Sequence, residues 1–373
     1  MKIKSISAKD NRTGWNVKNI QFNYMLTLLV GASGVGKTKI LNVIKTLVKI
    51  AKGESVNAFE WKVSFLQDGH DYVWEGAFET ITDANMIVLE EKENKRFNII
   101  KEIIIDDNTV LVDRNYERLL YKNQELVKLD NTKSVVELLK NESSLMPIYN
   151  GFRQCYDLDT TDTDTITIST LNNDDIKNEF FVRVLKELNI LSPLERLFVL
   201  HENNLNEYNL ICQKFQEIFP SVEKIGFTMI KKYGNINMII LRIKEKNIPE
   251  WIDQQEISSG MFRTLMQITT LVLANDGDVI MIDEFENGLG VNCINELADL
   301  IMDPETDVQV IMTSHHPYII NAIPVNDWKI LTRNGCDVHV HTAEQLNIGE
   351  HSKHEAFMQL LQTPEYKTGQ NRN

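Results

Sequence analysis

The sequence predicts an α/β fold with a mixed central sheet, an antiparallel β lobe and a short inserted helical lobe. Three patterns support this prediction. Apolar strands and helices alternate from Ile257 onward, short alternating runs fill residues 61–129, and helical spacing dominates residues 176–219. Near the start of the chain, an apolar run from Leu26 to Val30 leads into a glycine-rich loop and then into a helical repeat.

Length, composition and charge exclude several classes of protein. The chain has 373 residues, 43% of them hydrophobic and 25% charged, and no apolar run approaches the roughly 18 residues of a membrane span. Its start, Met1–Ile6, alternates like a strand, and its four cysteines are scattered, so we expect a cytoplasmic protein with reduced thiols. The net charge of −14 argues against strong DNA binding by a monomer, because neutralised phosphates supply most of that affinity. DNA contact is expected only from a basic groove in an assembly.

Residues 1–156 form the expected N-terminal lobe, in which the glycine-rich loop carries the first chemical motif. The loop reads Gly31-Ala32-Ser33-Gly34-Val35-Gly36-Lys37-Thr38 and fits the pattern GxxxxGK[ST] in full. Backbone N–H groups of such a loop cradle phosphates, the Lys37 ammonium holds the β- and γ-phosphates, and the Thr38 hydroxyl ligates Mg²⁺. A chance glycine turn is the alternative. The apolar strand before the motif and the amphipathic helix after it favour a P-loop that binds ATP and Mg²⁺.

The middle of the chain carries less chemistry. Short strand-like runs extend the N-terminal lobe as an antiparallel β lobe. Residues 157–221 are expected to form a loop rich in Asp, Thr and Asn, followed by helices. Residues 222–373 then form a C-terminal lobe that opens with a hairpin, Lys224–Ile230 and Ile236–Leu241, turned at residues 233–235.

Two carboxylates end the apolar run Val279–Ile282. Asp283 is placed to bind the Mg²⁺ shell, and Glu284 is placed to polarise an attacking water as a general base. Buried strands often end in acidic residues, so this pattern alone is weak. Paired with the P-loop upstream, it predicts an ATPase.

A second anion site is predicted just ahead of that strand. The segment Ile257-Ser258-Ser259-Gly260-Met261-Phe262-Arg263 opens a helix. Ser258, Ser259 and Gly260 would offer it free N–H groups, two hydroxyls and no side chain at the glycine. An ordinary serine-capped helix is the alternative. The position ahead of the Asp-Glu strand favours the anion site.

A histidine follows the next apolar strand, Val308–Met312. Polar residues that leave the carboxyl end of a parallel strand face the ligand crevice, so His315 is expected to sense the γ-phosphate. A histidine that merely caps the strand end is the alternative. The adjacent His316 and Pro317 are expected to be structural.

In this order, the P-loop, the Ser-Ser-Gly segment, the Asp-Glu strand end and the histidine resemble the ABC-type ATPase heads of the P-loop NTPases. Among these, the pattern looks like that of the SMC and RecF-like repair ATPases and of the ATPase domain of OLD-type nucleases. Glu284-Phe285-Glu286-Asn287-Gly288-Leu289 is similar to their D-loop region, and Thr313-Ser314-His315-His316-Pro317 to their switch. The resemblance covers residues 1–60 and 222–345 well and the middle of the chain poorly.

The resemblance implies a site shared between two copies. In these families two heads pack head-to-tail, so Ser258, Ser259 and Gly260 of one copy would contact the ATP on the P-loop of another. Arg12, in a segment similar to the Asn-Phe-Arg of the repair ATPases, would approach the nucleotide phosphates. A glutamine normally completes the metal site in these families, and Gln154 is our candidate.

Departures from these families limit the function. No long coiled coil separates the P-loop from the Ser-Ser-Gly segment, so spanning DNA through arms is not expected. Only about 45 residues follow Trp328, without clustered acidic residues, so no built-in nuclease is expected. His339 and His341 share one face of a strand but lack further ligands, so we expect no metal site there. Trp15 either stacks on adenine or packs in the core.

We therefore expect a Mg²⁺-dependent ATPase that forms a homodimer or higher homo-oligomer on binding ATP. By family analogy it would control a partner effector, a nuclease or toxin encoded nearby, in bacterial antiphage defence. The alternative is a RecF-like DNA-repair ATPase that binds DNA directly. An ABC transporter subunit is disfavoured, because Ile257-Ser258-Ser259-Gly260-Met261 stands where Leu-Ser-Gly-Gly-Gln is usual.

Overall fold

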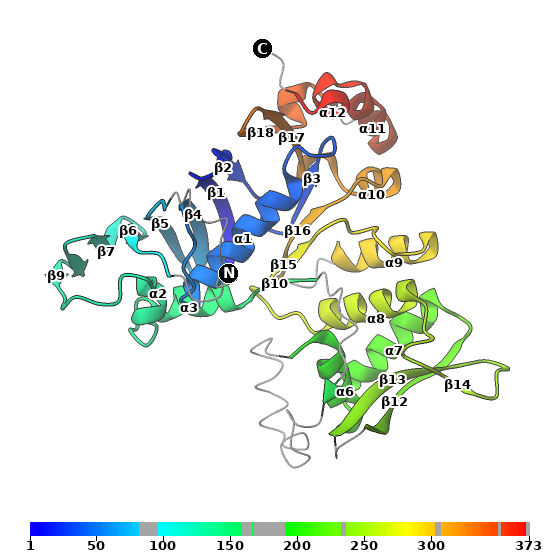
Figure 1. The fold of residues 1–373 in the computed structure, drawn as a ribbon. Helices are drawn as coiled ribbons and strands as arrows, with labels where there is room; N and C mark the ends of the chain where they lie inside the picture. Colours follow the sequence, from blue (N-terminus) through cyan, green and yellow to red (C-terminus); the bar gives the residue numbers. More distant parts are fainter. Residues whose placement is uncertain are drawn as a thin grey trace, which may run out of the picture. The chain divides into compact units, whose positions relative to one another are not determined.

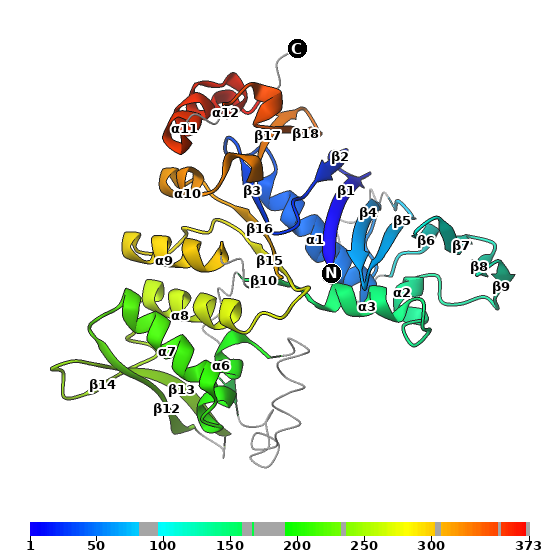
Figure 2. The ribbon, with the colours of Figure 1, turned by 180° about the vertical axis from the view of Figure 1, so that it is seen from behind.

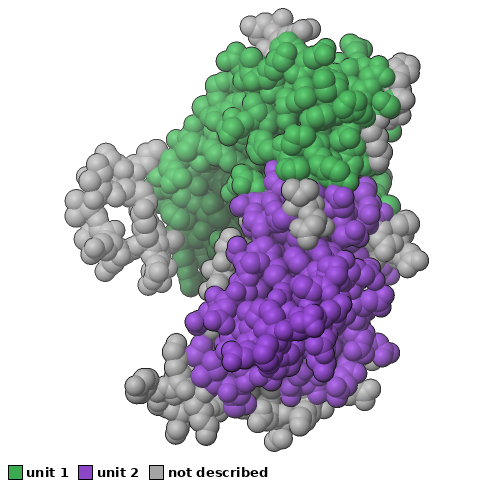
Figure 3. Space-filling model, turned by 90° about the vertical axis from the view of Figure 1, so that its right-hand side faces the viewer, with its two compact units in different colours: residues 1–157, 277–285, 308–373 green, residues 158–276, 286–307 purple. Residues whose placement is uncertain are grey.

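The fold comes from a computed structural model that describes residues 1–81, 96–158, 166–167, 191–232, 236–302, 307–349 and 352–370. The chain forms two compact units, each drawn in its own colour in Figure 3. The first unit comprises residues 1–157, 277–285 and 308–373, and the second comprises residues 158–276 and 286–307. Three chain segments therefore build the first unit, and it contains both the P-loop and the Asp-Glu strand end.

One large mixed sheet forms the framework of the first unit (Figure 1). Its strands are, in sheet order, β10 (Cys155–Asp157), β15 (Val279–Ile282), β16 (Gln309–Thr313), β3 (Leu26–Val30), β17 (Trp328–Asn334), β18 (Asp337–Thr342), β2 (Asn16–Gln21), β1 (Lys2–Asp10), β4 (Phe59–Gln67), β5 (His70–Phe78), β6 (Ile99–Asp106), β7 (Thr109–Asn115), β8 (Leu119–Tyr121) and β9 (Gln124–Glu125).

The sheet has a parallel half and an antiparallel half. Neighbouring strands from β10 through β15, β16 and β3 to β17 are all parallel. Every residue of β3, β15 and β16 is buried, as expected for strands covered on both faces. From β2 to β9 all pairs are antiparallel, and β4 alternates buried and less buried residues along its length. The parallel half therefore brings the carboxyl ends of β3, β15 and β16 to one edge.

Helices complete the first unit, and α1 packs along the sheet in both ribbon views (Figures 1 and 2). They are α1 (Lys37–Ala51), α2 (Val135–Leu138), α3 (Met146–Arg153), α10 (Pro317–Ala322), α11 (Lys353–Gln362) and α12 (Pro364–Thr368), with 3₁₀ turns η3 (Val325–Asp327) and η4 (Glu344–Leu346). The apolar stripe of α1, which includes Ile40, Ile44 and Leu47, is buried in the main core. Aromatic rings of Trp61, Trp74 and Phe152 fill the antiparallel half of that core.

The second unit combines helices with a small sheet. Its elements are α6 (Pro193–Glu202), α7 (Asn206–Ile218), α8 (Ser259–Val272), α9 (Val291–Ile301), β11 (Ile166–Thr167), β12 (Val222–Lys232), β13 (Ile236–Glu245) and β14 (Trp251–Asp253). Ser192 and Glu195 form a capping box that fixes the start of α6. Helix α8 packs against α6, α7 and α9. The helix that opens with the Ser-Ser-Gly segment is therefore anchored inside this unit.

The predicted α/β fold with an antiparallel lobe is confirmed, as are the hairpin strands β12 and β13. The first segment of the first unit ends at residue 157, and residue 222, where a C-terminal lobe was expected to begin, lies inside the second unit. Predicted helix within residues 168–190 and the turn at residues 233–235 lie outside the described residues. In the described part of the chain, no helix has the length and hydrophobicity needed to cross a bilayer.

A buried carboxylate ties the antiparallel strands to α2. Glu102 is fully buried and accepts hydrogen bonds from Trp74 Nε1 at 3.0 Å and from the Val135 backbone N–H at 2.9 Å. The Arg114 guanidinium, also buried, lies 3.5 Å from the same carboxylate. A buried charge is tolerated only when it is paired and hydrogen-bonded in this way.

We predict that Glu102→Gln lowers the free energy of unfolding by about 3–5 kcal/mol, because it leaves the Arg114 charge buried without its partner. Urea unfolding followed by tryptophan fluorescence measures this, since Trp74 contacts the substituted group. The matched control is Glu75→Gln, which removes the partner of Lys62 and Lys101 on the surface and should change stability by less than about 1 kcal/mol. Equal effects of the two substitutions would contradict the role given to Glu102.

Candidate active site

The P-loop joins β3 to α1, and two of its glycines are required by the geometry. Gly31 has a φ of +150°, and a Cβ there would lie 2.6 Å from the Leu331 carbonyl oxygen. Gly36 has a φ of +112° and is the N-cap of α1, whose first two residues are Lys37 and Thr38. The loop therefore leads its backbone N–H groups into the helix N-terminus, which is a preformed site for phosphate.

Lys37 lies inside this loop. Its Nζ donates hydrogen bonds to the carbonyl oxygens of Gly31 at 2.9 Å and Ala32 at 3.0 Å, and its side chain is buried. A buried ammonium held at the mouth of a glycine loop fits the charge of phosphate oxygens. The residues present therefore fit a nucleoside triphosphate at this position.

Asp283 connects three chain segments at the carboxyl edge of the parallel strands. Its Oδ1 accepts hydrogen bonds from Thr38 Oγ1 at 3.2 Å and from Thr313 Oγ1 at 2.7 Å. Thr38 opens α1, Asp283 follows β15, and Thr313 ends β16. Hydroxyl and carboxylate oxygens are the ligands that Mg²⁺ prefers, so Thr38 and Asp283 fit a Mg²⁺ site.

Glu284 is exposed and held in a strained backbone conformation. Its φ is +45°, a left-handed value that costs a non-glycine residue about 1–2 kcal/mol. Two hydrogen bonds compensate: Glu284 N donates to Thr313 Oγ1 at 2.8 Å, and Phe285 N donates to the Thr313 carbonyl oxygen at 3.0 Å. Phe285, the residue after Glu284, is fully buried, and its ring anchors this side of the turn. The turn therefore holds the Glu284 carboxylate toward solvent at the edge where Asp283 lies.

The two switch histidines differ. His315 is exposed and follows Thr313 and Ser314 at the end of β16, at the same edge as Asp283. His316 caps α10, since its Nδ1 accepts the Tyr318 backbone N–H at 3.3 Å. His316 therefore has the structural role predicted for it, and His315 remains the candidate γ-phosphate sensor.

The Ser-Ser-Gly segment opens α8 in the second unit. Ser258 is the N-cap, and its hydroxyl accepts the Met261 backbone N–H at 3.2 Å, so it acts at least as an ordinary helix cap. Ser259 is exposed at the first turn. A Cβ at Gly260 would lie 2.9 Å from the Gly288 carbonyl oxygen, so the glycine lets the segment after Glu286 approach the helix start.

Arg12 lies in an exposed turn close to the P-loop. The Asp10 carboxylate accepts backbone N–H groups from Arg12 at 2.9 Å and Thr13 at 3.3 Å, which fixes the turn. Trp15 ends this turn and is buried, with its Nε1 lying 3.6 Å from where a Cβ at Gly36 would be. Core packing beneath the P-loop is thus the role the structure gives Trp15, in preference to adenine stacking.

Gln154 is not brought to the site. It precedes β10, and its carbonyl oxygen accepts the Val279 backbone N–H at 3.0 Å. Because β10 runs parallel to β15, Gln154 lies beside Asp278, at the amino end of the strand. Asp283 lies at the carboxyl end, roughly 16 Å away along the strand. The side chain of Gln154 therefore does not reach a cation held by Thr38 and Asp283.

One protein family matches part of the chain. Residues 163–321 match the family described as "AAA domain, putative AbiEii toxin, Type IV TA system". The match covers less than half of the chain, and it includes the Asp-Glu pair after the parallel strand β15 but not the P-loop that follows β3. The P-loop after β3 and the Asp-Glu pair after β15, both in one mixed sheet, resemble the arrangement in ABC-type ATPase heads.

Several solved structures of SMC heads are similar to this chain. An SMC head bound to the C-winged helix domain of ScpA gives a TM-score of 0.46 at 13% identity, over 91% of this chain and 98% of that chain. The SMC head of Thermotoga maritima gives 0.42 at 12% identity, over 92% and 99%. A Pyrococcus furiosus Smc head with an extended coiled coil, bound to the C-terminal domain of ScpA, gives 0.42 at 14%, over 92% and 97%. No curated protein is similar to the chain at a significant level.

Thr313 is the residue of the ATPase head that sequence reasoning missed. It was part of the predicted switch, but its hydroxyl joins Asp283 to the Glu284 backbone. A threonine at the last position of an apolar strand, just before the switch histidine, was the available indication. Its role depends on β16 lying beside β15, which local sequence does not reveal.

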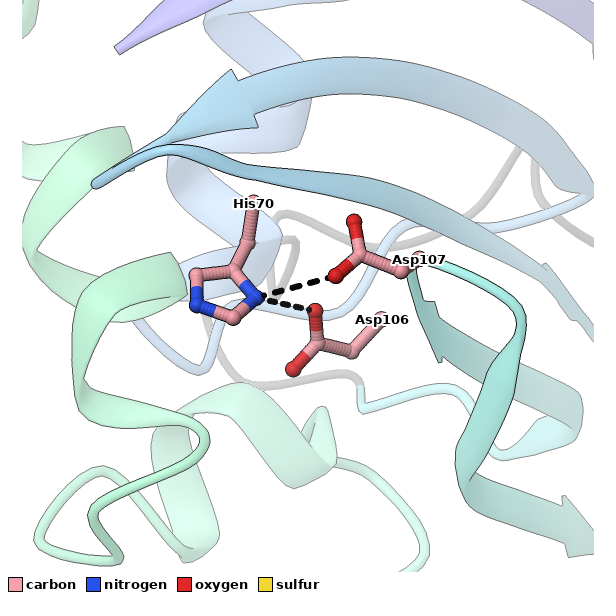
Figure 4. A group of neighbouring side chains, drawn as sticks. All are labelled: His70, Asp106 and Asp107. Carbon is pink, nitrogen blue, oxygen red and sulfur yellow. Dashed lines mark hydrogen bonds and ion pairs between the residues drawn. The ribbon is translucent and has the colours of Figure 1, made fainter.

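A separate cluster lies at the turns that join the antiparallel strands (Figure 4). His70 Nδ1 lies 3.0 Å from Asp106 Oδ1 and 3.2 Å from Asp107 Oδ2, and His70 and Asp107 are more than half exposed. The Asp106 carboxylate is the main cause that raises the pKa of His70, and Asp107 adds to it. A protonated imidazole satisfies both carboxylates, so we assign the cluster as an ion pair that stabilises the two turns.

We predict that Thr313→Val lowers ATP turnover by about 10-fold or more, because Asp283 and the Glu284 turn lose their shared partner. Nucleotide affinity should stay within about threefold, since the P-loop is unchanged. Steady-state kinetics and equilibrium nucleotide binding measure the two effects separately. The control is Thr332→Val, which also removes a buried hydroxyl, but from β17, and which should leave turnover unchanged. Unchanged turnover in Thr313→Val would contradict the role of this threonine.

We predict that stability depends on His70 only when the imidazole is charged. A pKa raised by folding contributes stability that is present below the ordinary value of about 6.5 and is lost as pH rises through the raised value. The melting temperature of His70→Gln should therefore lie below that of the parent at pH 6 and match it at pH 9. His339→Gln, at an exposed position of β18, should show no such pH dependence. A difference that is larger at pH 9 would contradict the assignment.

Proposed function

We propose that this ATPase head binds and hydrolyses Mg²⁺·ATP, and that ATP joins two copies head-to-tail to control a partner protein. The observation that carries the proposal is the convergence of Thr38, Asp283 and Thr313 at one edge of the sheet. That edge also presents Glu284 and His315. A chain that only bound nucleotide would need the P-loop but not the further residues that meet at this edge.

Each site residue that the first unit contributes has a role in the proposed reaction. Lys37 exchanges its bonds to loop carbonyls for bonds to the β- and γ-phosphates. Thr38 and Asp283 would hold Mg²⁺, which would neutralise charge on the phosphates. Glu284 accepts a proton from the attacking water, and His315 contacts the γ-phosphate. The strained Glu284 turn keeps the base pointing away from the protein core.

The proposed dimer supplies the second side of the site. Ser259 is exposed at the start of α8, where backbone N–H groups and the helix dipole favour an anion. We assign Ser259 and Gly260 to the γ-phosphate bound by another copy. The approach of the Gly288 carbonyl to Gly260 joins this helix start to the segment that follows Glu284. Closure of one site thereby acts on the other.

The partner is proposed to be a toxin or nuclease, in bacterial antiphage defence. The matched family is described by a putative toxin and a toxin–antitoxin system, which supports a toxin-linked role. Direct DNA binding has less support. A groove of about 360 Å³ on the sheet includes Lys62 and Lys101 in its lining, but both lysines pair with Glu75. The net charge of −14 also opposes binding to DNA.

We predict that Glu284→Gln binds ATP and forms a stable dimer, because the site closes but the water is not activated. Size-exclusion chromatography with light scattering, with and without Mg²⁺·ATP, should show the mass double only with ATP. Glu296→Gln, at an exposed position of α9, is the control and should behave as the parent. A Glu284→Gln variant that binds ATP and stays monomeric would contradict ATP-driven dimerisation.

Mixing two inactive variants tests whether Ser259 acts on another copy. Lys37→Ala should lose ATP binding, and Ser259→Arg should bind ATP but lose turnover. In a mixed dimer, one site combines an intact P-loop with an intact Ser-Ser-Gly segment, so turnover should return in part. Ser143→Arg, at another exposed serine, is the control and should keep full turnover. No recovery on mixing, with both variants folded, would count against the shared site.

A further inference from the structure

Residues 363–369, which we call the brace segment, meet the P-loop at Gly369. The brace segment consists of Thr363, helix α12 and Gly369. Gly369 has a φ of +67° and lies so close to the P-loop that a Cβ there would be 2.6 Å from Val35 Cγ1 and 3.1 Å from Ala32 Cβ. Val35 is buried by this packing. The brace segment therefore contacts the loop between the two glycines that shape it.

Strand β17 holds the brace segment in place. The Arg333 backbone N–H donates to the Gly369 carbonyl oxygen at 2.6 Å. The side chain of Arg333 turns back to the loop, where Nη1 donates to the Gly34 carbonyl oxygen at 3.4 Å and Nε donates to Gly335 at 2.7 Å. At the start of the loop, the Leu331 carbonyl oxygen lies against Gly31. The same strand therefore meets the start and the middle of the P-loop as well as the brace segment.

The brace segment is itself rigidly built. Thr363 caps α12 by accepting the Tyr366 backbone N–H at 3.3 Å, and Gly369 closes the helix by donating to the Glu365 carbonyl oxygen at 3.0 Å. Glu365 is buried. A short helix capped at both ends therefore places the residue that follows it, Gly369, against Val35.

We propose that the brace segment positions the P-loop, so that its displacement lowers the affinity for ATP. A P-loop binds phosphate through backbone N–H groups, and these must point into the loop before the ligand arrives. Contact at Ala32 and Val35 from outside limits the conformations of the loop that would turn those groups away. Gly369 is thus a positioning residue, and it contacts no phosphate itself. This inference rests on the proposed binding of ATP at the same site.

Two glycines give a matched experiment. Gly369→Ala places a methyl group against Val35, whereas Gly335→Ala has a similar φ of +59° with open space around the added carbon. Both substitutions carry the backbone cost of a left-handed residue. Only the first disturbs the P-loop, so the comparison separates loop positioning from general destabilisation.

We predict that Gly369→Ala weakens binding of a fluorescent ATP analogue by about fivefold or more, because overpacking moves the P-loop. Gly335→Ala should stay within about twofold of the parent. The double variant Gly369→Ala/Val35→Ala, which removes the Val35 methyl group that lies closest to the added carbon, should recover most of the affinity. Lys37→Ala gives the baseline without specific binding.

Hydrogen–deuterium exchange of the P-loop peptide, without nucleotide, tests the brace independently of ATP binding. Gly369→Ala should increase exchange across residues 31–38 relative to Gly335→Ala. Equal exchange and equal affinity in the two variants would overturn the brace. If the parent protein binds no ATP, the proposed function is refuted. Increased exchange in Gly369→Ala would then still support the contact between the brace segment and the P-loop, but the contact would have no role in ATP affinity.

Discussion

The candidate active site depends on the hydrogen bonds that Asp283 accepts from Thr38 and Thr313. They join the first turn of α1 to the ends of β15 and β16, although α1 is far from both strands in the sequence. Only parallel strands in the order β15, β16 and β3 bring these three ends to one edge. The parallel half of the sheet is therefore the part of the fold that makes the site.

Strain and close contact at this edge follow from the same constraint. Glu284 is held in a left-handed conformation because Thr313 accepts hydrogen bonds from the backbone N–H groups of both Glu284 and Phe285. Gly31 is needed because β17 passes beside the loop. Gly369 meets the loop from its other side. The chain thus fixes the P-loop and the candidate base before nucleotide binds, which reduces the cost of ordering them later.

Local motifs predicted most of this site from sequence. The P-loop and the Asp-Glu end of β15 are each a strand with its following turn, so neighbouring residues identify them. Gln154 failed because the end of β10 that faces the site depends on its direction beside β15, and no local pattern gives that direction. The role of Thr313 was missed for the same reason. Likewise, the sequence did not indicate that residues 277–285 and 308–373 would join the first unit.

The structure of the protein with Mg²⁺ and a non-hydrolysable ATP analogue tests the central claim most directly. The account predicts a cation about 2.1 Å from Thr38 Oγ1, with Asp283 in its coordination shell directly or through one water. It also predicts the β- and γ-phosphates beside Lys37. A nucleotide bound in the P-loop whose cation lies away from both Thr38 and Asp283 would contradict the account.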